Sequence, residues 1–225
     1  MSEEILKEAA ALEKHGHLEQ ALNSYGRALE VEPGNPEAWC SKGRVQSRLE
    51  DFNEALKSYE QAIALKPDFA RAWCNKGIVL QVLDRDEEAL EALERALQLD
   101  PDCAEAWYNK GLALRDLGRF QEALPCFDRI IAANPKNVDA WFSKGVTLRL
   151  MGDLAGSAET LVRALDIDRE DGDIWYELAK VRLAAGDASG AEQALGKAVE
   201  QDEDVKERVL EDEEMQGLQG SALLK

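Results

Sequence analysis

Apolar positions recur along the chain at helical spacing, and the whole pattern returns at a fixed period. Within each period, small and bulky apolar residues stand three or four positions apart, which places them on one face of an α-helix. The tryptophans mark the period, because each successive pair is 34 positions apart: Trp39, Trp73, Trp107, Trp141 and Trp175. A repeat of this length with two apolar stripes predicts two short helices per unit.

Glycine and proline recur in the same register. A glycine inside a helix costs about 1 kcal/mol relative to alanine, so its return four residues after the tryptophan, as at Gly43 and Gly77, indicates close packing. A second glycine phase predicts the turn between the two helices: Gly16, Gly118, Gly152 and Gly186. Prolines predict the end of the second helix: Pro33, Pro67, Pro101 and Pro135.

The segments Trp107-Tyr108-Asn109-Lys110-Gly111 and Ala123 to Pro135 resemble the tetratricopeptide repeat (TPR), and the resemblance covers nearly all of the chain. It implies an all-α fold, a right-handed superhelical solenoid of antiparallel helix pairs. The predicted solenoid spans residues 1–205, in units 2–35, 36–69, 70–103, 104–137, 138–171 and 172–205. Residues 206–225 are expected to form an acidic capping helix, a flexible tail, or both.

The end units depart from the family's pattern. Ile5 stands where the first unit would carry tryptophan, and Arg169 and Glu203 stand where the last two would carry proline. We expect terminal units to be atypical, because they have a neighbour on one side only.

The resemblance implies a protein–protein interaction scaffold that binds a peptide or protein segment in a concave groove lined by the first helices. Asn75 and Asn109 match the asparagine that, in several peptide-binding TPR superhelices, hydrogen-bonds the main chain of an extended ligand. A carboxamide suits this role because it both donates and accepts. Ser41 and Ser143 extend the row. The alternative is that all four are small polar residues on a solvated face.

Aromatic and basic residues complete the predicted groove. Tyr108, Phe142 and Tyr176 form an apolar strip in successive units, unless they pack against adjacent helices instead. The arginines expected in the groove are Arg44, Arg48, Arg71, Arg115 and Arg149. Groove acids and bases balance overall, but the first three arginines make the second and third units locally positive.

A lysine precedes each of the four glycines of the first helices, where the family usually has leucine: Lys42, Lys76, Lys110 and Lys144. They form either a basic ladder that attracts an acidic partner or four aliphatic stems that cover apolar surface while the amines stay in water.

Composition narrows the function. The chain carries 45 acidic and 27 basic residues, a net charge of −18, which disfavours nucleic acid. No apolar run is long enough for membrane insertion, the amino terminus is acidic, and four cysteines without a CxxC pair indicate reduced thiols, so we expect a cytoplasmic protein. The only histidines, His15 and His17, have no partners at ligand spacing, so we expect no enzymatic activity, cofactor or metal.

Two alternatives to a peptide-binding scaffold stay open. The chain could assemble into a homo-oligomer through its repeat ends or through a tail in which Leu218, Leu223 and Leu224 act as ligand. It could also be the targeting subunit of an enzyme on another chain.

Overall fold

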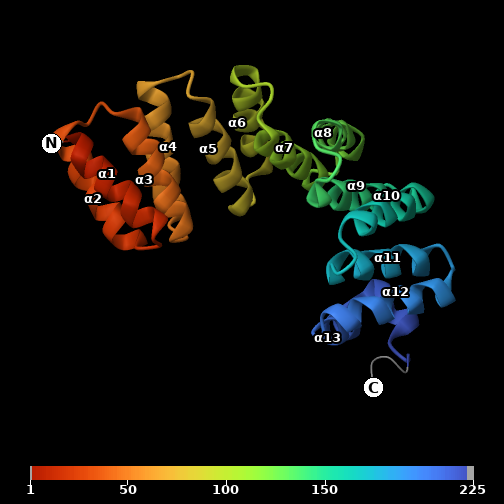
Figure 1. The fold of residues 1–225 in the computed structure, drawn as a ribbon. Coiled ribbons are helices and arrows are strands. Elements are labelled where there is room, and N and C mark those ends of the chain that lie inside the picture. Colours follow the sequence, from red (N-terminus) through yellow and green to blue (C-terminus); the bar gives the residue numbers. More distant parts are fainter. Residues whose placement is uncertain (1, 222–225) are drawn as a thin grey trace. The chain divides into compact units, whose positions relative to one another are not determined.

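The computed structural model describes residues 2–221, which form helices joined by short turns and contain no strand (Figure 1). The helices are α1 (Ser2–Lys14), α2 (Leu18–Val31), α3 (Pro36–Arg48), α4 (Phe52–Leu65), α5 (Ala70–Val82), α6 (Asp86–Leu99), α7 (Ala104–Asp116), α8 (Phe120–Ala133), α9 (Val138–Leu150), α10 (Leu154–Ile167), α11 (Gly172–Ala184), α12 (Ala188–Gln201), α13 (Val205–Glu211) and the 3-10 helix η1 (Glu213–Leu218).

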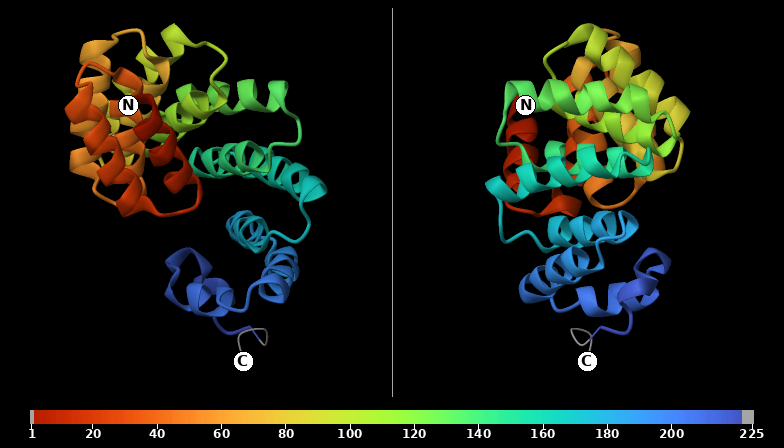
Figure 2. Two further views of the ribbon diagram at one scale, coloured as in Figure 1. Left: turned by 60° about the vertical axis from the view of Figure 1, so that its left-hand side comes forward. Right: turned by 90° about the vertical axis from the view of Figure 1, so that its right-hand side faces the viewer.

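Consecutive helices pair as antiparallel hairpins: α1 with α2, α3 with α4, α5 with α6, α9 with α10 and α11 with α12. The chain divides after Leu117 into two compact parts, called here the N-terminal unit and the C-terminal unit. Within each, the second helix of one hairpin packs on the first helix of the next (Figure 1, Figure 2). The predicted fold class, an all-α solenoid of antiparallel helix pairs, is confirmed.

The bulky apolar side chain at one recurrent position of each second helix is buried. These side chains are at most 3% exposed: Tyr25, Tyr59, Leu93, Phe127, Leu161 and Leu195. The helical glycines lie directly against them, because a Cβ atom on Gly77 would meet Cγ of Leu93 at 2.6 Å and one on Gly145 would meet Cδ2 of Leu161 at 2.7 Å. The close packing expected at the recurrent glycines is therefore present.

The turn between the helices of each hairpin uses a left-handed residue. Four such positions are glycines with φ between +71° and +84°, as predicted: Gly16, Gly118, Gly152 and Gly186. Glu50 and Asp84 occupy the same phase with φ of 63° and 55°. Because a Cβ atom disfavours this conformation, these two turns carry backbone strain that the glycine turns avoid.

Each tryptophan ties its hairpin to the preceding one through a hydrogen bond to the main chain. The indole Nε1–H donates to the carbonyl oxygen of the residue six positions earlier, at 2.8–3.0 Å: Trp39 to Pro33, Trp73 to Pro67, Trp107 to Pro101, Trp141 to Pro135 and Trp175 to Arg169. The bond persists where arginine replaces proline, because the acceptor is a backbone atom.

The segment after α12 begins a further hairpin and then turns away. Val209 of α13 falls one repeat period after Trp175 and is fully buried, as is Val205. The helix ends at Glu211, and the side chain of Asp212 accepts a hydrogen bond from the Glu214 N–H at the start of η1. Met215 then packs into the core formed with α11 and α12, so the segment covers the last hairpin.

Candidate functional site

A cleft of about 300 Å³ opens on the first helices of the N-terminal unit, between α3, α5 and α7. We call it the α3–α7 cleft. Its polar and charged lining comes from Arg44, Ser47, Arg48, Asn75 and Glu105, and its apolar and aromatic lining from Phe52, Tyr59, Ile78, Val79 and Val82. The predicted groove residues Arg44, Arg48 and Asn75 therefore lie in one cavity.

Arg44 is fixed in the wall of the cleft by a buried carboxylate. Its Nε and Nη2 atoms each donate to Glu13, both at 2.8 Å, in the two-pronged geometry that guanidinium and carboxylate favour. Glu13 is only 7% exposed and also accepts from the hydroxyl of Tyr25 at 3.1 Å. The hydrogen bond to Glu13 raises the pKa of Arg44, so its guanidinium stays charged.

Arg48 is held more loosely by the same residue. It donates to the Glu13 main-chain oxygen at 3.3 Å, and its Nη1 atom is 3.8 Å from the carboxylate. Its side chain is 47% exposed. Two guanidinium groups thus share one carboxylate, which leaves the α3 side of the cleft with a surplus positive charge.

Asn75 lies half-buried between a polar floor and solvent. Its Nδ2 atom is 3.8 Å from Sγ of Cys40, a weak contact, and the hydroxyls of Tyr59 and Ser47 are 3.2 Å apart beside it. Burial raises the pKa of the Cys40 thiol, and it raises that of Tyr59 to about 12. Both groups are therefore neutral, and the floor can hydrogen-bond without contributing charge.

The other groove residues predicted in this unit lie outside the lining of the cleft. Asn109 turns its Nδ2 atom back to the Glu105 main-chain oxygen at 2.8 Å, and Arg115 pairs with its neighbour Asp116 at 2.9 Å. Arg71 is exposed, with its guanidinium 5.3 Å from the centroid of the Phe69 ring. The remaining two groove residues of this unit, Ser41 and Tyr108, are half-buried.

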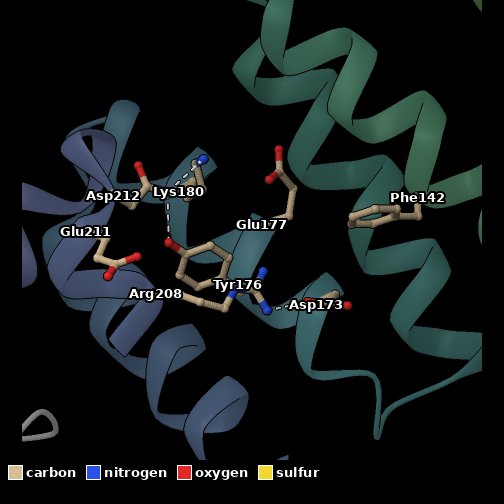
Figure 3. Close-up of a pocket in the computed structure, with 8 residues that line it drawn as sticks. All are labelled: Phe142, Asp173, Tyr176, Glu177, Lys180, Arg208, Glu211 and Asp212. Carbon is tan, nitrogen blue, oxygen red and sulfur yellow. Dashed lines mark hydrogen bonds and ion pairs between the residues drawn. The ribbon is translucent and has the colours of Figure 1, made fainter. Parts of the chain in front are cut away.

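The C-terminal unit has a separate cavity of about 590 Å³ (Figure 3). It is lined by Phe142, Asp173, Tyr176, Glu177, Lys180, Arg208, Glu211 and Asp212. Arg208 lies over the Tyr176 ring, 4.6 Å from its centroid, and pairs with Asp173 at 2.6 Å. The lining of the cavity therefore comes mainly from α13 and α11, and α9 contributes Phe142.

The start of η1 brings two carboxylates to the cations of this unit. Asp212 accepts from the Tyr176 hydroxyl at 2.8 Å and lies 3.0 Å from Nζ of Lys180. Glu214 is 2.6 Å from the same amine and 2.9 Å from Arg149. The tail thus neutralises cations that the sequence pattern assigns to the predicted groove.

The four groove residues predicted in this unit differ in their accessibility, and two of them, Arg149 and Tyr176, contact the tail. Phe142 and Tyr176 meet at the cavity, although only 6% of Tyr176 is exposed. Arg149 is paired with both Glu177 and Glu214, and Ser143 is 2% exposed. Sequence reasoning did not single out the tail contacts, although Val209 at the tryptophan phase signalled that the periodic pattern continues past residue 205.

Residues 2–221 contain neither a metal-binding cluster nor a membrane-spanning helix. This part of the chain has no group of three or more His, Cys, Asp or Glu side chains placed to hold a metal ion. None of its helices is long and apolar enough to cross a membrane.

Helical hairpins repeated at a fixed period, with clefts on the first helices, define a class of all-α repeat proteins. Models of the tetratricopeptide repeat match residues 6–49, 40–102, 76–141, 126–157 and 148–220. The chain belongs to the tetratricopeptide repeat family. A search of curated proteins finds no match.

Solved structures share the fold. The chain is 24% identical to PilW, a type IV pilus biogenesis factor, with a TM-score of 0.81 over 97% of this chain and 98% of that one. It is 19% identical to pilF of Pseudomonas aeruginosa (TM-score 0.78, 97% and 96% covered) and 23% identical to YrrB, a TPR protein with an unusual peptide-binding site (TM-score 0.67, 80% and 93% covered). The fold is that of protein–protein interaction scaffolds, which are generally non-catalytic adaptors.

Proposed function

We propose that the protein is a non-catalytic adaptor that binds an extended segment of a protein partner on its first helices, with the α3–α7 cleft as the primary site. The observation that carries this proposal is that Arg44, Arg48 and Asn75 line one cavity beside the exposed side chain of Val82. Each of the three was expected in the groove from its position in the repeat.

The cleft has the chemistry that an extended peptide requires. Asn75 can donate to and accept from a peptide unit regardless of the ligand's side chains. Val82 is 53% exposed at the rim, and covering such a side chain stabilises a complex by roughly 1 kcal/mol. Arg48 adds a cation that is only partly paired. Together these groups provide backbone recognition, apolar contact and charge.

The proposal extends to the other groove residues along the first helices. In the N-terminal unit these are Ser41, Arg71, Tyr108, Asn109 and Arg115. In the C-terminal unit, Phe142 is accessible at the cavity and Ser143 is buried, whereas Arg149 and Tyr176 would contact a ligand only after Glu214 and Asp212 leave them.

The same proposal specifies the partner and the compartment. We expect a protein or peptide partner and no nucleic acid, because the net charge is −18. We expect a cytoplasmic location, because all four cysteines are free thiols. A homo-oligomer formed through the tail would require Leu218 to leave the core in which it is buried, and the other tail leucines, Leu223 and Leu224, lie outside the described residues. A role as the targeting subunit of an enzyme on another chain would use the same cleft.

Peptide selection tests the proposal. Peptides selected from a random display library on the full chain are measured by fluorescence polarisation against wild type, Asn75→Ala and Asn53→Ala. Asn53 is exposed on α4, outside the cleft, and serves as the control. We expect Asn75→Ala to weaken binding by about tenfold, equivalent to about 1.4 kcal/mol, and Asn53→Ala to leave it unchanged. Equal affinity for all three proteins would contradict the proposal.

A further inference from the structure

Three helices each contribute one polar group to the α3–α7 cleft: a cation from Arg48 on α3, a neutral carboxamide from Asn75 on α5 and a carboxylate from Glu105 on α7. We propose that the cleft selects an extended segment with a carboxylate at one end, an aliphatic side chain in the middle and a basic side chain at the other end. This inference rests on the proposed function and adds the chemistry of the partner.

The acidic end of the ligand is set by the charge balance around Glu13. Arg44 uses both prongs of its guanidinium on that carboxylate, whereas Arg48 donates to a neutral main-chain oxygen at 3.3 Å. A guanidinium has five N–H donors, so Arg48 retains donors for a second carboxylate. A ligand carboxylate on α3 would balance the surplus charge there.

The C-terminal unit provides an internal precedent for a first-helix cation that binds carboxylates, at a position four residues before that of Arg48. Lys180 stands at the repeat position of Arg44, four repeat periods later, and it binds two carboxylates. Both come from Asp212 and Glu214, at the start of a short 3-10 segment rather than a long helix. First-helix cations of this chain therefore already accept acidic side chains from a docked segment.

The basic end of the ligand is set by Glu105. This residue is exposed on α7 and faces the same cleft. None of the ion pairs formed within residues 2–221 uses its carboxylate, and the bond from Asn109 goes to its main-chain oxygen. A lysine or arginine of the ligand would supply the missing counter-charge, whereas an acidic residue there would be repelled.

The spacing between the two ends follows from helix packing. Neighbouring helices lie about 8–10 Å apart, so two steps from α3 to α7 span roughly 16–20 Å. An extended chain advances about 3.3 Å per residue and crosses this span in about five or six residues. Between the ends, Ile78 and Val82 on α5 offer an apolar surface. The expected ligand therefore has an acid and a base about five or six residues apart, with an aliphatic residue between them.

Selection from a random twelve-residue display library tests this inference on wild type, Arg48→Gln, Glu105→Gln and Lys57→Gln. Lys57 is the control, because it is exposed on α4 and pairs with Glu54, outside the cleft. We expect wild-type and Lys57→Gln selections to enrich the acid–aliphatic–base pattern. Arg48→Gln should lose enrichment of the acid and keep that of the base, and Glu105→Gln should do the converse. Arg48→Lys keeps the charge and should restore the preference for the acid.

The outcomes separate this inference from the function on which it rests. Selected peptides whose binding depends on Asn75 but which lack the paired charges would overturn the inference and leave the proposed function in place. Enrichment no greater than on a surface without protein would overturn both. Enrichment patterns that are the same for wild type and both glutamine variants would also overturn the inference. Circular dichroism of each variant verifies that the helices are intact.

Discussion

Lys76 places its Nζ atom 3.0 Å from Oε1 of Glu60, sixteen residues earlier, on the second helix of the preceding hairpin. The same amine is 5.8 Å from the centroid of the Trp73 ring. The arrangement recurs where Lys110 pairs with Glu94 and Lys144 with Asp128. Each of these three lysines lies over a tryptophan ring, and its amine pairs with an acid of the preceding hairpin. This favours the interpretation in which the aliphatic part of each lysine covers apolar surface over the one in which the amines form a basic ladder for an acidic partner.

A comparison of Lys76 with Lys42 measures the contribution of the Lys76–Glu60 ion pair to stability, because both lysines lie near a tryptophan ring. Lys42 lies 5.1 Å from its tryptophan ring, but the position sixteen residues before it is Gly26, and it forms no ion pair within residues 2–221. Lys→Met retains the stem and removes the charge. We expect Lys76→Met to cost about 0.5 kcal/mol more than Lys42→Met. Urea midpoints at about 0.05 M and 0.5 M NaCl should show this difference shrinking with salt. Equal effects of both substitutions at low salt would contradict the bridge.

Gly77→Ala should destabilise the protein by about 1–3 kcal/mol, because the new methyl group would lie 2.6 Å from Cγ of Leu93 and force the hairpin apart. Gly26→Ala is the matched control in α2, where a Cβ atom meets nothing within 4 Å. It should stabilise its helix by about 0.5–1 kcal/mol. Thermal unfolding followed by circular dichroism measures both. Destabilisation by the two substitutions alike would indicate that packing against Leu93 is not the cause.

Glu50→Gly should stabilise the first of the two strained turns. Removing the Cβ atom at φ of 63° relieves strain, and the entropy that glycine gains in the unfolded chain offsets part of the gain, so the net effect is about 0.5–1 kcal/mol. The reverse change, Gly152→Ala, tests conformation alone, because its φ is +84° and nothing lies within 4 Å. It should destabilise by about 1 kcal/mol. Opposite shifts in the thermal midpoint are expected, and shifts of the same sign would refute the argument.

Acid should release the tail. Although partial burial opposes it, hydrogen bonds from Lys180 and Tyr176 lower the pKa of Asp212 below its usual value. The hydrogen bond from Lys180 likewise lowers the pKa of Glu214. A carboxylate whose pKa is lower in the folded state stabilises that state above its ordinary pKa of about 4, and this contribution is lost as the pH falls through the folded value.

The substitutions Asp212→Asn and Glu214→Gln together should therefore lower the thermal midpoint at neutral pH, and the difference from wild type should fade near pH 3, as a rough figure. Asparagine keeps an oxygen that can accept the η1 N-cap bond, so the readout reports charge. Neutralising Glu207 and Glu213, which form no ion pair within residues 2–221, matches the change in net charge. A difference that persists undiminished in acid, or an equal effect of the control pair, would contradict this account.

The sequence predicted those features that repeat. The period located the turns at Gly16 and Gly152 and the close packing at Gly77, because both depend on local helix geometry, whereas the partner of Gly77, Leu93, came from the structure. It did not single out the bond between Glu13 and Arg44, since an acid at that repeat position has no periodic counterpart. The periodic pattern could assign these residues to one face, but their pairing depends on three-dimensional packing.

The tail was less predictable for a related reason. Val209 continues the tryptophan phase, but α13 ends before Asp212. The packing of η1 on α11 depends on the burial of Met215 in the core, which the repeat does not predict. The placement of Asn75 in a cleft and of Asn109 outside it also depends on neighbours in space, although the two occupy the same repeat position.

The bond from Trp175 to the Arg169 carbonyl has a consequence for how such a chain can evolve. Because the acceptor is a backbone oxygen, the side chain at that position can change from proline to arginine while the joint between hairpins stays intact. The tryptophan thus forms the same hydrogen bond to the preceding hairpin whichever side chain the acceptor residue carries. Hairpins joined in this way can be duplicated, lost or exchanged as modules, and their binding surfaces can diverge independently of the joints that hold them together.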